Sequence, residues 1–321
     1  MQNINTPVLL ITYRRLDTTL KVLESIRSVR PQKIYISSNA PNPSKQDDLE
    51  KVMSVRQGIE GLIDWPCEVK KMYRTEHLSA KDSIWLAICW LFENEEQGII
   101  LEDDTLPDSS FFYYCEELLN KFKDDKDIRF INGCNFNYKK LKKSYGFTRF
   151  MNMWGWATWR RSIELVDQNM TEWKSMPDKL TFLENIFDKQ HPRIKELASA
   201  YLLKQFDDTA SGKIDTWDFQ CIFSNFFSGS YTVFPTKNMV TNLGFGAIDA
   251  THTNFESYFL SAMKLEKMSF PMTGPDRKIN DEYFFQFLLE RWIGIKYRSR
   301  LYYSIKHRLF SAKKKLGLLK R

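Results

Sequence analysis

Between residues 98 and 107 the chain reads Gly98-Ile99-Ile100-Leu101-Glu102-Asp103-Asp104-Thr105-Leu106-Pro107. The apolar residues 99–101 predict the end of a strand that is buried on both faces, as in a parallel sheet covered by helices. Three adjacent carboxylates at its tip repel one another, and a hard divalent cation, Mn²⁺ or Mg²⁺, is the simplest compensation. Because ligands of open α/β sheets bind beyond the carboxyl ends of the strands, this turn is predicted to hold a metal together with phosphates. The alternative is a solvated acidic turn before a helix capped at Asp108.

Length and composition limit the classes of protein that fit the chain. Its 321 residues, with 43% hydrophobic side chains, suffice for one large or two modest domains with a substantial core. No stretch reaches about 18 uncharged apolar residues, which predicts no transmembrane helix, and no secretory leader is expected before the first strand. The five cysteines are widely spaced and form no CxxC pair. They fit reduced thiols in a cytoplasmic protein better than a disulfide or zinc framework.

Positive charge is concentrated at the C-terminus. The formal net charge is +7, and residues 291–321 carry eleven Lys or Arg and no acid, so subtracting these leaves about −4 for residues 1–290. A mildly acidic body argues against a nucleic-acid partner. The cations of 291–321 are mixed with apolar residues such as Trp292, Leu309 and Phe310, which is typical of a basic amphipathic segment on an anionic membrane surface. A solvated charged helix or a disordered arm is the alternative.

Strands and helices alternate up to the acidic stretch. Their predicted order is βαβαβαβ, the pattern of a parallel sheet with helices on its faces. Neither a Walker A loop nor a GxGxxG motif follows the first strand, so P-loop and dinucleotide-binding interpretations are weak. We expect strands at 7–13, 33–38, 67–73, 99–101, 128–133 and 231–235, and helices at 17–29, 47–58, 79–93, within 170–210 and at 215–227.

Polar side chains follow the first two predicted strands, on the same edge as the acids. An aromatic ring at the first strand tip is suited to stack on a base, and an arginine there is suited to pair with phosphate. A lysine opens the helix before the acidic strand, where a cation and free N–H groups suit a diphosphate. An ordinary basic turn and a solvated lysine are the alternatives. The candidate residues are Thr12, Tyr13, Arg14 or Arg15, Ser38, Asn39 and Lys81.

Three features of the second half are also candidates for function. Trp154 and Trp156 stand in an unusual cluster, and indoles stack on sugar faces as readily as they fill cores. Asp218 opens a helix, where it is either an N-terminal cap or a general base aimed into the crevice. Residues 241–253 are Gly-rich and polar, which predicts a mobile lid; His252 within it is a candidate metal or diphosphate ligand, with an exposed loop histidine as the alternative.

Four segments, taken together, resemble a known family. They are Thr12-Tyr13-Arg14-Arg15, the stretch 98–104, Thr216-Trp217-Asp218-Phe219-Gln220, and Asn242-Leu243-Gly244-Phe245-Gly246 with Asp249-Ala250-Thr251-His252-Thr253. In this order, and over roughly residues 5–255, the chain resembles bacterial GT-A glycosyltransferases related to the nucleotide-diphospho-sugar transferases of the N-acetylglucosaminyltransferase I type. The acidic stretch is similar to the Glu-Asp-Asp form of the DxD motif of that family.

The resemblance implies a GT-A (Rossmann-like), mostly parallel sheet flanked by helices, in a domain at 1–255. A donor half at about 1–110, an acceptor half at about 111–255 and a helical basic extension at 256–321 are expected. It also implies a nucleotide-diphosphate sugar, Mn²⁺ or Mg²⁺, and transfer with inversion. By position, Asp104 would bind the metal, Glu102 and Asp103 would lie by the ribose and donor sugar, and Asp218 would be the base. Residues 244–254 would close over the donor.

We therefore expect a metal-dependent glycosyltransferase of polysaccharide biosynthesis. Its acceptor would be a surface glycan or a lipid-linked sugar, and the enzyme would be cytoplasmic and peripheral on the inner face of the membrane through its basic tail. A nucleotidyltransferase or metal-dependent phosphohydrolase using the same acids is the first alternative, although the former is expected to carry a Gly-rich phosphate loop. A non-catalytic, membrane-associated sugar-nucleotide-binding protein is the second.

Overall fold

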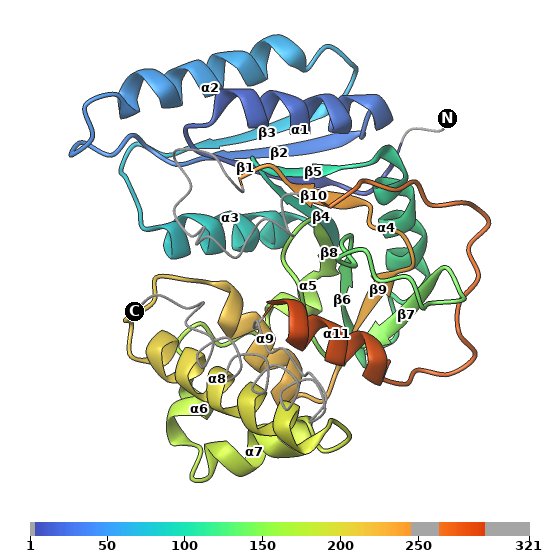
Figure 1. The fold of residues 1–321 in the computed structure, drawn as a ribbon. Coiled ribbons are helices and arrows are strands. Elements are labelled where there is room, and N and C mark those ends of the chain that lie inside the picture. Colours follow the sequence, from blue (N-terminus) through green and yellow to red (C-terminus); the bar gives the residue numbers. More distant parts are fainter. Residues whose placement is uncertain (1–3, 245–262, 293–321) are drawn as a thin grey trace, which may run out of the picture.

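A computed structural model describes residues 4–244 and 263–292 of the chain. Its centre is an eight-stranded sheet of order β3-β2-β1-β4-β8-β6-β9-β7 (Figure 1). A separate two-stranded sheet pairs β5 with β10. The strands are β1 (Val8–Thr12), β2 (Lys33–Ser38), β3 (Glu68–Tyr73), β4 (Gln97–Glu102), β5 (Thr105–Pro107), β6 (Ile128–Asn132), β7 (Tyr145–Thr148), β8 (Trp156–Trp159), β9 (Tyr231–Pro235) and β10 (Val240–Asn242).

Helices cover both faces of the sheet, and several gather in a separate lobe. In Figure 1, α1 and α2 lie on one face of β1–β3, α3 lies on the other face, and α6–α8 form the lobe below the sheet. Within residues 4–244 and 263–292, no helix is long and apolar enough to cross a membrane. The helices are α1 (Leu16–Val29), α2 (Asp48–Leu62), α3 (Ala80–Asn94), α4 (Ser109–Lys121), α5 (Arg160–Ile163), α6 (Thr171–Ser175), α7 (Lys179–Ile186), α8 (Pro192–Ala210), α9 (Asp218–Phe227) and α11 (Glu282–Trp292).

The first half of the sheet has the predicted parallel arrangement. Strands β3, β2, β1 and β4 are all parallel, with Leu10 paired to Ile36 on one side and to Leu101 on the other. Every residue of β1 is buried, as expected for a strand with helices on both faces. Of the seven pairings in the sheet, the four parallel ones include β6 with β9. The predicted α/β class, a mostly parallel sheet flanked by helices, is therefore confirmed.

The tryptophan-rich stretch forms a strand that we did not predict. Strand β8 inserts between β4 and β6 and is antiparallel to both. All four of its residues are buried, including Trp156 at 1% exposure, because side chains on both sides of the sheet are covered there. A strand that is buried on both faces lacks the polar–apolar alternation that would have indicated it.

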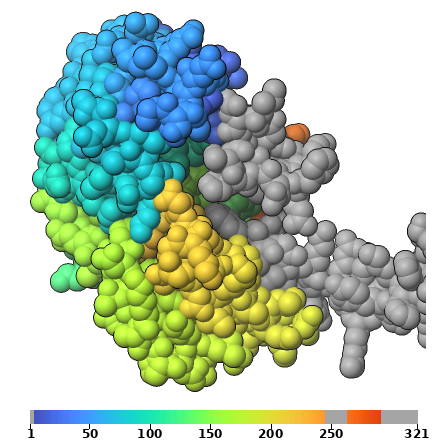
Figure 2. Space-filling view, turned by 90° about the vertical axis from the view of Figure 1, so that its left-hand side faces the viewer, coloured from blue at the N-terminus to red at the C-terminus, as the bar shows by residue number. Residues whose placement is uncertain are grey.

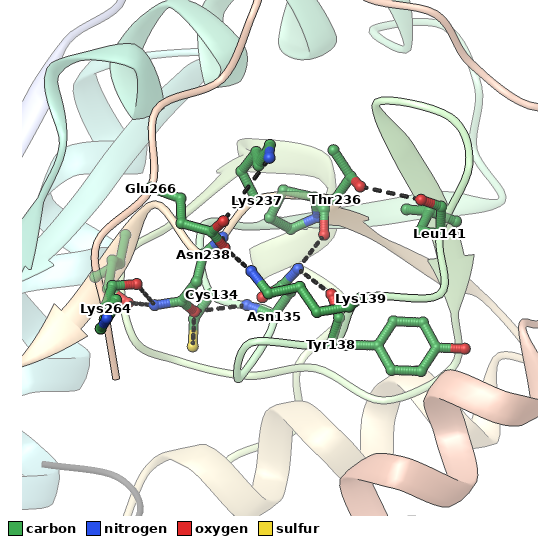
Figure 3. Close-up of polar contacts among 12 residues, drawn as sticks. Cys134, Asn135, Tyr138, Lys139, Leu141, Thr236, Lys237, Asn238, Lys264 and Glu266 are labelled. Atoms are coloured by element: carbon green, nitrogen blue, oxygen red, sulfur yellow. Dashed lines mark hydrogen bonds and ion pairs between the residues drawn. The ribbon is translucent and has the colours of Figure 1, made fainter. Parts of the chain in front are cut away.

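A buried polar cluster fixes the chain segments behind β10 (Figure 3). The side chain of Asn238 is fully buried, and its Nδ2 donates to the carbonyls of Val240 at 2.9 Å and Lys264 at 3.3 Å. Its Oδ1 accepts from the backbone N–H of Asn135 at 3.1 Å and from the thiol of Cys134 at 3.1 Å. Asn238 thus joins the loop after β6, the entry to β10 and the segment that begins at residue 263.

Replacing this asparagine should destabilise the whole fold. We expect Asn238→Leu to lower the free energy of unfolding by about 3 kcal/mol, because several buried hydrogen-bonding groups lose their partner at once. The exposed Asn169 provides a matched control, and Asn169→Leu should change stability by about 0.5 kcal/mol at most. Urea unfolding curves of the two variants measure both values. Similar midpoints for the two variants would show that the cluster contributes little.

Candidate functional site

A cavity of about 1270 Å³ opens at the carboxyl ends of the parallel strands. One wall is made by the tips of β1 and β4 with the start of α3, and the opposite wall by α8 and the start of α9. Figure 2 shows the blue and cyan half meeting the gold residues near position 215 on the side that faces the viewer. Of the predicted site residues, the cavity is lined by Thr12, Tyr13, Arg14, Asn39, Lys81, Glu102, Asp103, Asp104, Trp154 and Asp218.

Two contacts tie the walls of this cavity together at the start of α3. The carboxylate of Asp215 accepts a hydrogen bond from the backbone N–H of Ala80 at 3.1 Å. The ammonium of Lys81 lies 3.5 Å from the carbonyl oxygen of Gln168. A carboxylate is favoured at this position because the first N–H groups of a helix lack partners within the helix. The contacts hold the helical lobe against the parallel half of the sheet.

The acidic turn after β4 is fixed mainly by backbone contacts. The hydroxyl of Thr105 accepts from the N–H of Glu102 at 2.9 Å and donates to the carbonyl of the same residue at 3.0 Å. The N–H of Leu243 donates to the carbonyl of Asp104 at 2.7 Å, which attaches β10 to the turn. The carboxylate of Asp103 accepts from the N–H of Tyr13 at 3.1 Å, so the tips of β1 and β4 are joined.

The carboxylates of this turn carry more negative charge than their arginine neighbour compensates. Arg15 forms an ion pair with Asp104 at 2.7 Å. Burial still raises the pKa of Asp104, and burial together with the charge of Asp104 raises the pKa of Asp103 to about 7. The pKa of Glu102 lies well above its usual range because of burial first, then the charges of Asp104, Asp103 and Asp218. Asp218 is one of these charges, and it lines the same cavity as the acidic turn.

The raised pKa of Asp103 predicts how stability depends on pH in the metal-free protein. A folded-state pKa of about 7 means that the folded chain holds a proton that the unfolded chain releases near pH 4. The stabilisation from this proton is complete below about pH 4 and is lost as the pH rises through about 7. Because asparagine mimics the neutral carboxyl, Asp103→Asn should melt at a higher temperature than the wild type at about pH 8, by less at about pH 5, and at a similar temperature at about pH 4.

This prediction is tested by melting curves of both proteins in EDTA across that pH range. A melting-temperature difference that does not change with pH would show that Asp103 titrates normally. If Asp103→Asn is less stable than the wild type at high pH, the carboxylates of the acidic turn do not destabilise the fold by their negative charge.

The donor set of the acidic turn fits a hard divalent cation. Besides its ion pair with Arg15, the carboxylate of Asp104 accepts a long contact of 3.4 Å from the side-chain amide of Asn242. The excess negative charge at the turn is of the kind that a cation relieves. Among the described residues no three carboxylate, imidazole or thiol groups converge on one point. Asp104, with Asp103 beside it, would therefore share the ion with phosphates and water, as is common for Mg²⁺.

An aromatic and polar subsite, partly missed by the sequence analysis, lies beyond the tip of β1. The rings of Tyr13 and His77 are 5.6 Å apart and tilted by 33°. The phenol of Tyr13 donates to the fully buried Asp48, which also receives the guanidinium of Arg14 at 2.6 Å. Burial, with this bond next, raises the pKa of Tyr13. His77 follows β3, so the rule that located the tips of the first two strands would also have found it.

Several predicted donor-binding side chains already have protein partners. The amide of Asn39 donates to the carbonyl of Leu78 at 2.9 Å and accepts from two backbone N–H groups, so both ends of the amide already have protein partners. Ser38 is fully buried, accepts from Arg56 at 3.1 Å and does not line the cavity. The hydroxyl of Thr12 donates to the carbonyl of Ser37 at 3.1 Å. The cation beside the acidic turn is Arg15, whereas Arg14 faces α2.

The opposite wall presents the predicted base. Asp218 is the first residue of α9, and its Oδ1 accepts from the N–H of Phe219 at 2.7 Å and from the hydroxyl of Thr216. Tyr201 and Gln205, one turn apart on α8, line the cavity beside it. Burial first, and then the charge of Asp218, raises the pKa of Tyr201. These two α8 residues carried no sequence signal, since they belong to a polar helical stretch without a motif.

The two predicted acceptor tryptophans differ in their position. Trp154 is half-buried, lines the cavity and packs 5.5 Å from the ring of Phe136. Trp156 lies behind the wall in the core, stacked 5.8 Å from Trp217 at an interplanar angle of 22°. His252 and the predicted lid from residue 245 onward lie outside the described residues.

No protein-family model and no curated protein matches this sequence. Among solved structures, the chain is similar to the mannosyltransferase PcManGT from Pyrobaculum calidifontis in complex with GDP-Man and Mn²⁺ (TM-score 0.36, 12% identity, 70% of this chain and 74% of that chain). It is also similar to HddC from Yersinia pseudotuberculosis complexed with GMP-PN (0.31, 12%, 50% and 79%). A third is 4-diphosphocytidyl-2C-methyl-D-erythritol synthase from Anaerococcus prevotii DSM 20548 (0.33, 11%, 62% and 96%).

The names or bound ligands of these three proteins refer to sugar transfer or to nucleotides. None of the three is named as an N-acetylglucosaminyltransferase I. With TM-scores of 0.36 or less, the likenesses carry no argument about the activity of this chain. The activity has to be inferred from the cavity itself.

Proposed function

We propose that the protein is a metal-dependent glycosyltransferase, which moves a sugar from a nucleotide-diphosphate sugar to a hydroxyl of a glycan or lipid-linked acceptor. The main support is that an acidic turn and a separate helix-terminal carboxylate, Asp218, face one large cavity from opposite walls. The charge of Asp218 also contributes to the raised pKa of Glu102, which supports this pairing. Such a pair suits a reaction in which one site holds a diphosphate and the other accepts a proton.

The donor would lie along the tips of β1 and β4. The nucleobase of the donor would lie near the rings of Tyr13 and His77. The diphosphate would lie near Arg15, Lys81 and the first N–H groups of α3. Asp104 and Asp103 would hold a divalent cation, which when bound offsets the charge of the diphosphate and makes it a better leaving group. Arg15 adds a fixed positive charge at the same place.

The transfer would be completed from the opposite wall. The acceptor hydroxyl attacks the anomeric carbon while the bond from that carbon to the diphosphate oxygen breaks, and Asp218 takes the hydroxyl proton. Attack from the face opposite the leaving group inverts the anomeric centre. Trp154, Tyr201 and Gln205 would hold the acceptor sugar by stacking and hydrogen bonds. General-base help of this kind is worth roughly a hundred- to ten-thousand-fold in rate.

We also propose that the enzyme works at the inner, anionic face of the membrane, where a lipid-linked acceptor would be found. The support is the composition of residues 291–321, which combine eleven Lys or Arg with aromatic and aliphatic residues. Residues 293–321 lie outside the described part of the chain.

A thermal-shift panel tests the donor chemistry. Nucleotide sugars, nucleoside triphosphates and sugar phosphates would each be added with and without Mn²⁺. A ligand that binds only the folded state at a hundred times its dissociation constant adds about 2.7 kcal/mol of stability. We expect one nucleotide sugar to raise the melting temperature, and only in the presence of Mn²⁺. A shift with a triphosphate alone would favour the nucleotidyltransferase, and no shift with any compound would contradict the proposal.

A further inference from the structure

A strongly basic surface lies over β7 and beside the segment that begins at residue 263, and no step of the proposed reaction uses it. The loop that precedes β7 contributes four exposed lysines within five residues: Lys139, Lys140, Lys142 and Lys143. Three more come from other parts of the chain: Lys237, Lys264 and Lys267. Figure 3 shows Lys139 and Lys237, from two of these segments, both directed at Glu266. These seven residues are called the lysine face below.

Little negative charge balances the lysine face. In the three stretches that form it, residues 134–144, 235–240 and 263–275, Glu266 is the single acidic residue. Its carboxylate already receives Lys139 and lies 3.8 Å from Lys237. Asp281 is a second carboxylate close by, beside Tyr138. Two carboxylates against seven ammonium groups leave a positive surface that attracts anionic partners within about one Debye length, roughly 10 Å.

Apolar side chains are exposed on the chain segment from residue 263 to α11, which also carries Lys264 and Lys267. Leu265 is 38% exposed, Phe270 43%, Ile279 58% and Tyr283 73%. The ammonium of Lys140 lies 5.7 Å from the ring centroid of Tyr283, which places lysine and aromatic side by side. In Figure 1 the segment with these residues runs around the outside of β7 toward α11. A soluble polyanion needs only the lysines, whereas a lipid headgroup region accepts both lysines and apolar side chains.

The basic C-terminal residues continue from the same part of the fold. Helix α11 packs behind the lysine loop, with the ring of Phe284 lying 5.2 Å from Tyr138 and 3.6 Å from Phe234. The chain that follows α11, residues 293–321, contains ten Lys or Arg and no Asp or Glu. We propose that the lysine face is a folded docking surface for an anionic membrane, with its exposed apolar side chains entering the headgroup region. The proposal rests on the membrane location suggested above and not on the donor chemistry.

Sedimentation of the full chain with lipid vesicles tests this. The vesicles would be phosphatidylcholine mixed with phosphatidylglycerol, and phosphatidylcholine alone. Each lysine near an anionic surface is worth about 1 kcal/mol, or about fivefold in affinity, so Lys140→Gln, Lys142→Gln and Lys143→Gln together should weaken binding about a hundredfold. The matched control replaces the exposed Lys21, Lys71 and Lys174, on α1, β3 and α6, and should bind as the wild type does.

A further variant separates a membrane from a soluble polyanion. Phe270→Ser should weaken binding to the mixed vesicles about tenfold, because burying the exposed part of this side chain contributes about 1.4 kcal/mol, or about tenfold in affinity. Three results would overturn the proposal. They are unchanged binding of the triple lysine variant, an equal loss in the control variant, and unchanged binding of Phe270→Ser. The metal-dependent thermal shift with a nucleotide sugar should be the same in all these variants, so failure here is distinguishable from failure of the proposed function.

Discussion

Asp218→Asn is expected to lower turnover by roughly a hundred- to ten-thousand-fold while leaving binding of the sugar donor nearly intact. The substitution removes the proton acceptor but keeps an oxygen that accepts the hydrogen bonds from Phe219 and Thr216. The start of α9 and the shape of the cavity should therefore be preserved. Turnover would be measured with the nucleotide sugar that the thermal-shift panel identifies, and binding by the shift itself.

Asp215→Asn is the matched control for this experiment. Asp215 also lines the cavity and also accepts a backbone hydrogen bond, from Ala80 at 3.1 Å, but it holds the start of α3. Its substitution should cost less than about tenfold in turnover, because an asparagine oxygen replaces the acceptor. Wild-type turnover in Asp218→Asn would refute its role as the base. A larger loss in Asp215→Asn than in Asp218→Asn would move that role to Asp215.

Asp104→Asn is expected to weaken metal-dependent donor binding by more than about a hundredfold, because it removes a charged ligand from the predicted ion site. The folded state should survive, since the change relieves repulsion among buried carboxylates and leaves Arg15 beside Asp103 and Glu102. Titration calorimetry with the identified donor, with and without Mn²⁺, measures the loss.

Asp108→Asn is the control for the metal site. Asp108 is the next acid along the chain, caps α4 and does not line the cavity. Asparagine caps helices as well as aspartate does, so stability and donor binding should both stay as in the wild type. If Asp104→Asn keeps its Mn²⁺-dependent affinity, the ion is held elsewhere.

The parallel half of the fold and one wall of the cavity could be predicted from the sequence. The strands at Val8–Thr12, Lys33–Ser38 and Gln97–Glu102 each combine a continuous apolar run with a polar tip. The carboxyl ends of parallel strands lie at one edge of the sheet. Polar residues that follow such strands are therefore expected to lie close together, even when they are far apart in the sequence. The raised pKa values at Glu102, Asp103 and Asp104 arise from this arrangement.

The arrangement of the second half of the chain could not be predicted, because it depends on contacts between residues that are far apart in the sequence. Strand β8 lies between β4 and β6, but its short, buried Trp-Ala-Thr-Trp sequence would suit pairing with several other strands as well. The sequence therefore does not specify its place in the sheet. Tyr201 reaches the cavity only because α8 packs against α9. Similarly, Arg14 and Arg15 are adjacent in sequence, and their roles separate only because Asp48, 34 residues after Arg14, receives the first of them.

A crystal structure with Mn²⁺ and the identified nucleotide sugar would show whether the metal and the diphosphate lie at the acidic turn. We expect an anomalous manganese peak within bonding distance of the Asp104 carboxylate and of the donor phosphates. We also expect the nucleobase of the donor beside Tyr13, and its anomeric carbon on the side of the cavity that faces Asp218. A nucleotide sugar bound at the strand tips with its diphosphate away from Asp104, or with its anomeric carbon shielded from Asp218, would contradict the proposed function.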